Sequence, residues 1–157
     1  MNDKHDHAAV IAPPPLLLAL CIAAGFIVQH FKPLPLFPGA HRFLRALCIT
    51  FFAVAAIIFF LAIREFIEHH THPSTRKPTA ELVVTGIYRW TRNPIYIAFL
   101  LIVLALAVGA NNAWLLLSAI ALFVLLHFGV VKREEHYLST KFGSIYDDYS
   151  RRVRRWI

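Results

Sequence analysis

The chain is poor in charge, cysteine and glycine, and each shortage argues against a class of protein. Charged residues make up 16% of its 157 residues and apolar residues 58%, whereas soluble domains carry about 25% charge, which argues against a water-soluble globule. Its two cysteines, Cys21 and Cys48, lie in apolar runs, so buried free thiols are expected instead of a disulfide framework. Its six glycines form no Gly-x-Gly-x-x-Gly pattern, which argues against the usual dinucleotide-binding loop of soluble enzymes.

Three long uncharged runs are present instead, at residues 8–31, 46–63 and 93–131. A helix needs about 20 residues to cross a bilayer, so each of the first two runs predicts one transmembrane helix. The third is about twice that length, and the turn-forming Gly109-Ala110-Asn111-Asn112 near its middle predicts a helical hairpin. We therefore expect an all-α integral membrane protein with four spans, with three spans and one very long or re-entrant segment as the alternative.

The basic residues predict the orientation of these spans. Lys32, Arg42 and Arg45 flank the first connection, and the other 13 of the 16 basic residues accompany the amino terminus, the second connection and the tail. The positive-inside rule then places both termini in the cytoplasm, as expected of a bacterial inner-membrane protein. Because the basic residues lie beside apolar runs, the net charge of +7 favours an anionic lipid surface as a partner over nucleic acid.

Polar groups that bracket the hairpin are the candidates for chemistry. A charge at mid-bilayer costs at least about 2.5 kcal/mol, so Arg92 and Glu134 should lie close together at the mouth of the hairpin. Arg92 offers a planar fork for a carboxylate, and Glu134 or Glu135 can accept hydrogen bonds from an amine or from sugar hydroxyls. A simple interfacial pair between arginine and glutamate is the alternative.

Two sequence blocks on either side of the hairpin carry a resemblance. The first runs from Gly86-Ile87-Tyr88 to Arg92-Asn93-Pro94-Ile95-Tyr96, and the second contains Glu134-Glu135, Phe142-Gly143, Tyr146 and Tyr149. Together they resemble the isoprenylcysteine carboxyl methyltransferase family and the related membrane phospholipid methyltransferases, over about residues 78–157. The resemblance implies one membrane methyltransferase domain over residues 1–157, with the first two spans in 1–70 and the cofactor-binding, catalytic half in 78–157.

The same resemblance implies a transfer of the methyl group of S-adenosylmethionine to a lipophilic or lipid-linked acceptor. The expected catalytic residues are Arg92, Tyr96 and Glu135. The expected cofactor-binding residues are Ala80, Glu81, Leu82, Val83, Tyr88, Asn93, Pro94, Ile95, Tyr96 and Glu134. The two tyrosines can present aromatic faces to the sulfonium cation, with an interfacial tyrosine belt as the alternative. Pro94 suits a first helical turn, whose amides can receive cofactor oxygens.

The sequence leaves three classes of methyl acceptor: a carboxylate, a thiol and an amine. Asn93 stands where many members of the resembled family have histidine, which excludes a general base at that position. An ionised carboxylate or thiolate needs no base, whereas an amine would need one. The candidates for that base are Glu135, His136 and Tyr146. Val130 aligns with the arginine that binds the acceptor in that family, so Lys132 or Arg133 would have to replace it.

The tail shows a helical pattern of its own. Tyr146, Tyr149, Val153 and Trp156 recur at intervals of 3, 4 and 3, which predicts a C-terminal amphipathic helix in the membrane interface. This helix would anchor the chain, close over the cofactor, or do both.

The nine histidines suggest a competing hypothesis, a small membrane transporter or metal-binding protein. His69, His70 and His72 follow the second span, but the cluster lacks the cysteine or carboxylate partners of a known metal site, so we expect no metal site. His127 in the fourth span is either satisfied between helices or lines an acceptor tunnel. A non-catalytic membrane interaction module also remains open, as does association into a homo-oligomer.

Overall fold

The computed structural model describes residues 8–37, 39, 41–69 and 81–157, and every regular element among them is helical. This confirms the all-α class for the described part of the chain, which contains no strand. The elements are α1 (Pro14–Phe31), α2 (His41–Glu68), the 3-10 helix η2 (Gly86–Arg89), α3 (Pro94–Gly109), α4 (Ala113–Leu126), the π-helix η3 (His127–Val131), α5 (Lys132–Phe142) and α6 (Ser144–Arg152).

Three of the described helices are long and apolar enough to cross a membrane. They are Pro14–Phe31, Arg42–Glu68 and the continuous helix Ala113–Phe142. The apolar α3 has 16 residues, somewhat fewer than the about 20 that a full crossing needs. The count of four spans therefore stays a prediction.

Local chemistry explains where these helices begin. α1 and α3 both have proline in their first turn, where its missing N–H is not needed for a helical hydrogen bond. α4 begins after Asn112, whose side chain accepts a hydrogen bond from the Trp114 amide at 2.9 Å. Between α3 and α4, Asn111 adopts a positive φ of 48°, which asparagine tolerates better than most residues. These residues close the predicted hairpin.

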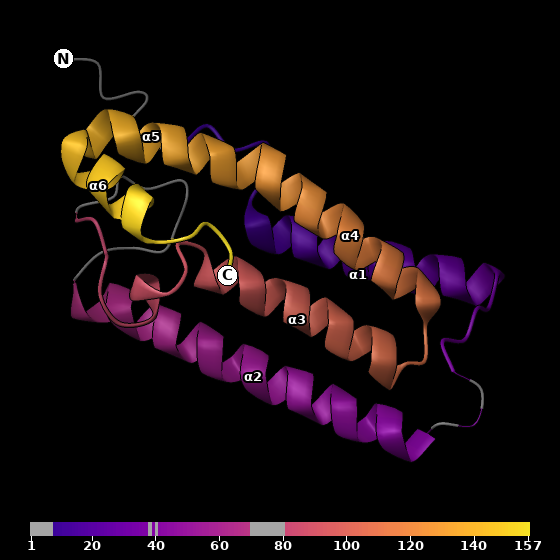
Figure 1. The fold of residues 1–157 in the computed structure, drawn as a ribbon. Coiled ribbons are helices and arrows are strands. Elements are labelled where there is room, and N and C mark those ends of the chain that lie inside the picture. Colours follow the sequence, from indigo (N-terminus) through magenta and orange to yellow (C-terminus); the bar gives the residue numbers. More distant parts are fainter. Residues whose placement is uncertain (1–7, 38, 40, 70–80) are drawn as a thin grey trace.

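The helices pack in the order α2, α3, α4, α1, so that consecutive α1 and α2 lie on opposite sides of the hairpin (Figure 1). The shared core lies between α3 and α4 and is filled by fully buried Val103, Leu115, Leu122 and Leu126. Large apolar side chains cover the outer faces of α1 and α2. Such an apolar exterior is what a lipid environment requires and what water would disfavour.

The two connections at the far end of the hairpin are bonded to each other. Asn111 Oδ1 accepts hydrogen bonds from the amides of Leu36 and Phe37 at 2.9 and 3.0 Å, and Trp114 Nε1 donates to the Lys32 carbonyl at 2.7 Å. Residues 33–37 are non-helical, as their prolines predict. Both connections therefore lie at one end of the bundle.

The second half of the chain differs from expectation in two places. The helix that follows the hairpin turn does not stop with the uncharged run at Val131 but continues through η3 into α5, as far as Phe142. The tail helix is also shorter than its pattern predicts: α6 ends at Arg152, and Val153 is extended, with φ −116° and ψ 131°. Trp156 therefore lies in a non-helical segment. An interfacial position of α6 stays a prediction.

The two cysteines are free, with Cys21 buried and Cys48 half-buried. Both are free thiols, as expected, and the expectation of burial is met fully at Cys21 and partly at Cys48.

Candidate functional site

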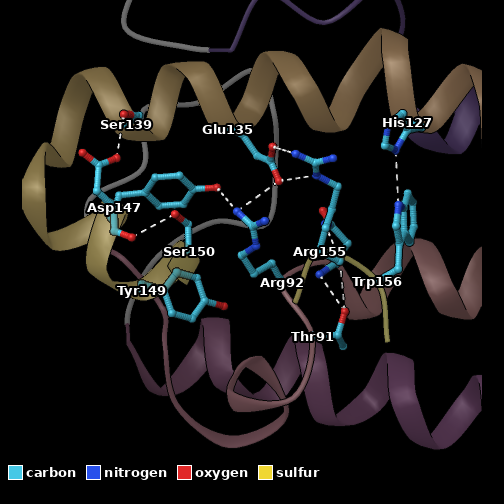
Figure 2. A network of polar contacts seen from close by, with 12 residues as sticks. Thr91, Arg92, His127, Glu135, Ser139, Asp147, Tyr149, Ser150, Arg155 and Trp156 are labelled. Carbon is cyan, nitrogen blue, oxygen red and sulfur yellow. Dashed lines mark hydrogen bonds and ion pairs between the residues drawn. The ribbon is translucent and has the colours of Figure 1, made fainter. Parts of the chain in front are cut away.

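The two blocks that flank the hairpin meet at one end of the bundle, where the start of α3 faces α5 and the tail (Figure 2). Residues distant in sequence become neighbours here because α3 and α4–α5 run antiparallel and return to the same end. This is the end at which the sequence predicts a site.

Glu135 is the centre of a cluster of ion pairs (Figure 2). Arg155 donates from Nε to Oε1 at 2.8 Å and from Nη2 to Oε2 at 2.7 Å, a bidentate arrangement. Arg92 Nη1 approaches Oε1 to 3.1 Å, with side chains 13% exposed at Arg92 and 17% exposed at Glu135. The hydrogen bonds to Glu135 raise the pKa of Arg155. The carboxylate partner of Arg92 is therefore Glu135, and Glu134 has a different one.

Glu134 pairs with the start of α3. Tyr96, which is 8% exposed, donates its hydroxyl to Glu134 Oε1 at 2.7 Å. This bond joins the first turn of α3 to the first turn of α5 across the mouth of the hairpin. The expected proximity of the two blocks is found, with tyrosine in place of arginine as the partner of Glu134.

The Arg92 guanidinium keeps one donor unused. Its Nη1 donates to the Tyr146 hydroxyl at 3.1 Å, and its Nε is buried with no hydrogen-bond partner. Burial raises the pKa of Tyr146 and the Glu135 charge adds to this, while Arg92 opposes it. A buried donor without a partner costs about 1–3 kcal/mol. An acceptor atom supplied by a ligand would remove that cost.

The tail lies across the mouth as a non-helical strap, which we define as residues 153–157. The Arg92 amide donates to the Arg154 carbonyl at 3.0 Å. The Asn93 side-chain amide donates to the Arg155 carbonyl at 2.8 Å. Trp156 Nε1 donates to His127 Nδ1 at 3.2 Å (Figure 2). His127 is thus satisfied by the strap, which sequence reasoning did not anticipate.

Tyr88 lies in η2 and is buried, at 6% exposed. Its ring packs edge-on against Phe66, with 5.5 Å between centroids, and its carbonyl accepts a hydrogen bond from the Tyr149 hydroxyl at 2.8 Å. Burial raises the pKa of both tyrosines, so both hydroxyls stay protonated at neutral pH. Since Tyr88 and Tyr96 both face the interior, neither has the lipid-facing position of an interfacial belt.

The remaining predicted cofactor-binding residues differ in how deeply they are buried. Ala80 lies outside the described residues. Glu81 is exposed, Leu82 and Ile95 are half-buried, and Val83, Asn93 and Pro94 are buried.

The expectation of free amides at the start of α3 is wrong for three positions. The Asn93 amide donates to Thr91 Oγ1, and the amides of Tyr96 and Ile97 donate to the Asn93 carbonyl. The chain therefore satisfies these donors itself.

No group of three or more histidine, cysteine, aspartate or glutamate side chains in the described part of the chain is arranged to hold a metal ion. His70 and His72 of the predicted cluster lie outside that part.

Neither basic residue near the buried Val130 points its charge at the Glu135 cluster. Lys132 Nζ lies 4.6 Å from the centre of the Phe128 ring, and Arg133 Nη1 donates to the Ala9 carbonyl at 2.7 Å. His136 of α5, a candidate for the general base, is exposed.

Fold and site together define a membrane protein of apolar helices with a partly buried polar site at one end. The family model described as phospholipid methyltransferase matches residues 42–145, more than half of the chain, and the chain belongs to this family. Membership confirms the resemblance seen in the two sequence blocks and indicates methyltransferase activity.

Two curated proteins are similar to parts of the chain. An uncharacterised protein of Haemophilus influenzae is 37% identical over 62 residues, which cover 40% of this chain and 98% of that protein. The nickel-cobalt-cadmium resistance protein NccN of Alcaligenes xylosoxydans xylosoxydans is 39% identical over 82 residues, 51% of this chain and 37% of NccN. The chain thus matches little more than a third of NccN.

Proposed function

We propose that the protein transfers the methyl group of S-adenosylmethionine to a lipophilic or lipid-linked carboxylate, thiol or amine at the cytoplasmic face of a bacterial inner membrane. One observation carries this proposal. The two blocks separated by the hairpin meet through the Tyr96–Glu134 hydrogen bond and the Arg92–Glu135 ion pair. Family membership supplies the reaction class.

The residues of the site fit S-adenosylmethionine, which carries a carboxylate, an amine, ribose hydroxyls and a sulfonium cation. The unused, buried Nε donor of Arg92 fits an anionic oxygen. The Glu134 carboxylate fits the amine or the hydroxyls, and the buried rings of Tyr88 and Tyr96 fit the cation. When bound, the cofactor supplies an electrophilic methyl group.

The chain's own residues then bind and align the reactants. Arg92, Glu135 and Arg155 hold the start of α3, α5 and the strap together, which fixes the site in one geometry. Holding a nucleophile in line with a methyl group is itself a large contribution to rate. Asn93 supplies no proton acceptor and instead holds the Arg155 carbonyl. We keep Arg92, Tyr96 and Glu135 as the proposed catalytic residues.

The proposal includes four spans, cytoplasmic termini, and membrane lipids and a lipophilic acceptor as partners, with no nucleic acid. The outer faces of α1 and α2 expose apolar side chains that suit contact with lipid. These faces also offer a surface for association of two copies of the chain.

Calorimetric titration of the folded protein in detergent with S-adenosylhomocysteine tests the cofactor. We expect binding below millimolar concentration, weakened about tenfold, or 1.4 kcal/mol, by Glu134→Ala. Glu68→Gln, which changes an exposed carboxylate paired with Arg64, is the matched control. Absence of binding at millimolar ligand would overturn the proposal. Mass spectrometry of membrane lipids incubated with methyl-labelled cofactor then identifies the acceptor.

A second candidate is a role in metal resistance, which the name of NccN favours. If the histidines at positions 69, 70 and 72 bind metal, Ni²⁺ should raise the thermal unfolding midpoint and the triple alanine variant should lose that shift. A methyltransferase without a metal role should show no shift and should keep its cofactor affinity in the same variant.

A further inference from the structure

Glu65 is a buried carboxylate that the sequence patterns did not single out. It lies one turn before the end of α2 and is 8% exposed. Beside it on the same helix, Ala62 and Phe66 pack against Val83 and Tyr88. A buried charge is costly unless polar partners compensate for it. Its partners therefore indicate what it does.

Those partners are Thr85 and Gly86, the N-cap and the first residue of η2, the turn that contains the buried Tyr88. The Thr85 hydroxyl donates to Glu65 Oε2. A Cβ atom on Gly86 would clash with Glu65 Oε1 and Cδ, so a larger residue at position 86 would displace the carboxylate from this place. Gly86 also has a positive φ of 53°, which favours glycine independently. Carboxylate and turn are thus fitted closely to each other.

The turn in question carries Tyr88. The Tyr88 amide donates to the Thr85 carbonyl at 2.9 Å, so the residue that bonds Glu65 is also the N-cap of η2. On its other side, the Tyr88 carbonyl accepts from Tyr149 of α6. The turn is therefore fixed between α2 and α6, with Glu65 as a polar contact on the α2 side and His69 Nε2 at 3.4 Å from the Thr85 hydroxyl.

We propose that Glu65 is a positioning residue for methyl transfer: its carboxylate seats the Thr85-Gly86 turn and thereby holds Tyr88 in the cofactor site. This inference rests on the proposed function. Glu65 acts through Tyr88 and contacts neither the methyl donor nor the acceptor. A carboxylate that served the fold alone would change the unfolding midpoint and leave the affinity of the folded protein for the cofactor unchanged.

Substitutions at Thr85 give the first test, with calorimetric affinity for S-adenosylhomocysteine and the thermal unfolding midpoint both measured in detergent. Thr85→Val keeps the shape and removes the hydroxyl, and we expect it to weaken affinity about tenfold. Thr85→Ser keeps the hydroxyl and should restore affinity to near the wild-type value. Glu68→Gln, three residues along α2 and exposed, should behave as wild type. Equal affinities for Thr85→Val and the wild type would overturn the proposal, as would failure of Thr85→Ser to restore affinity.

A double-mutant cycle between Glu65 and Gly86 gives the second test. Gly86→Ala introduces both backbone strain and a clash with the carboxylate, whereas in the Glu65→Ala background only the strain remains. Because the strain is common to both backgrounds, we expect Gly86→Ala to cost less affinity when residue 65 is alanine. Additive effects would contradict the proposed contact.

The two proposals fail in different ways. If folded wild-type protein does not bind S-adenosylhomocysteine, the proposed function is wrong. If the wild type binds but the Thr85 series and the cycle show no effect on affinity, the cofactor assignment stands and the role of Glu65 is wrong.

Discussion

At the scale of single residues, Glu135 has the densest set of charged partners in the site. Its two oxygens accept hydrogen bonds from Arg155 of the strap, and Oε1 also forms an ion pair with Arg92 at the α3 entrance. Two guanidinium groups against one carboxylate leave a net positive cluster. Removing the carboxylate would place two uncompensated cations side by side in a partly buried position, which is more costly than loss of one hydrogen bond.

We therefore expect Glu135→Gln to destabilise the protein by about 3 kcal/mol, the lower end of the cost of breaking a buried ion pair, because the cluster is partly exposed. The thermal unfolding midpoint in detergent measures this. Asp148→Asn is the control, because Asp148 and Arg151 form an exposed pair on α6 and such pairs contribute about 0–1 kcal/mol. Equal effects of the two substitutions would show that the cluster around Glu135 does not hold the site together.

The hydroxyl of Tyr96 gives a second prediction at this scale. Tyr96→Phe keeps the buried ring and removes the donor to Glu134, so the carboxylate loses the group that orients it. We expect about tenfold weaker binding of S-adenosylhomocysteine, or 1.4 kcal/mol. Tyr137→Phe on α5, which removes a hydroxyl bonded to exposed Lys141, should leave binding unchanged. Wild-type affinity in Tyr96→Phe would show that this hydrogen bond does not contribute to cofactor binding.

The site shows which contacts a sequence can predict. The cost of charge in a bilayer was enough to predict that arginine and the glutamates converge at the mouth of the hairpin. It was not enough to predict which glutamate faces Arg92, since neighbouring residues point about 100° apart around a helix. The π-helical η3 just before α5 shifts that rotation further, and nothing in the sequence pattern signals it.

At the scale of elements, the strap is the segment whose structure the sequence predicted least well. The spacing of Tyr146, Tyr149, Val153 and Trp156 is helical, yet only the first two lie in α6 and both are buried. The strap leaves the helical conformation because its carbonyls accept hydrogen bonds from Arg92 and Asn93. Contacts between residues so far apart in sequence leave no local periodicity to recognise.

Truncation tests the strap directly. A chain that ends at Arg152 loses the carbonyl acceptors at positions 154 and 155 and the Arg155–Glu135 pair. We expect at least about tenfold weaker binding of S-adenosylhomocysteine. Removal of Ile157 alone, which is exposed, should leave the affinity unchanged. Wild-type affinity in the longer truncation would show that the strap only covers the site.

At the scale of the whole molecule, the helices could be predicted from apolar runs but their packing order could not. The order α2, α3, α4, α1 depends on close fits between particular surfaces. A Cβ on Gly25 of α1 would lie 2.5 Å from Leu115 of α4, and one on Gly109 of α3 would lie 2.6 Å from the Cys48 sulfur of α2. Hydropathy counts these glycines as neutral positions, although each permits two helices to approach.

Contacts at the two ends of the bundle support an even number of spans. The Arg92 amide is bonded to the Arg154 carbonyl, which puts the α3 entrance and the tail at one end. Asn111 is bonded to Leu36 and Phe37, which puts the hairpin turn and the first connection at the other. If α4 crosses the membrane between these ends, α3 must cross it as well. At 16 residues α3 is about 24 Å long, and its flanking helices α2 and α4 cover much of it.

Reporter fusions test the resulting topology. With both termini cytoplasmic, green fluorescent protein fused after Ile157 should fluoresce, alkaline phosphatase fused there should be inactive, and alkaline phosphatase inserted at Gly39 should be active. The reason is electrostatic, since the first connection carries three basic residues and the remaining 13 of 16 lie on the other side. Active phosphatase after Ile157 together with activity at Gly39 would mean an even number of crossings between them instead of the expected three. If α3 were the helix that does not cross, Arg92 could not share a compartment with the strap to which it is bonded.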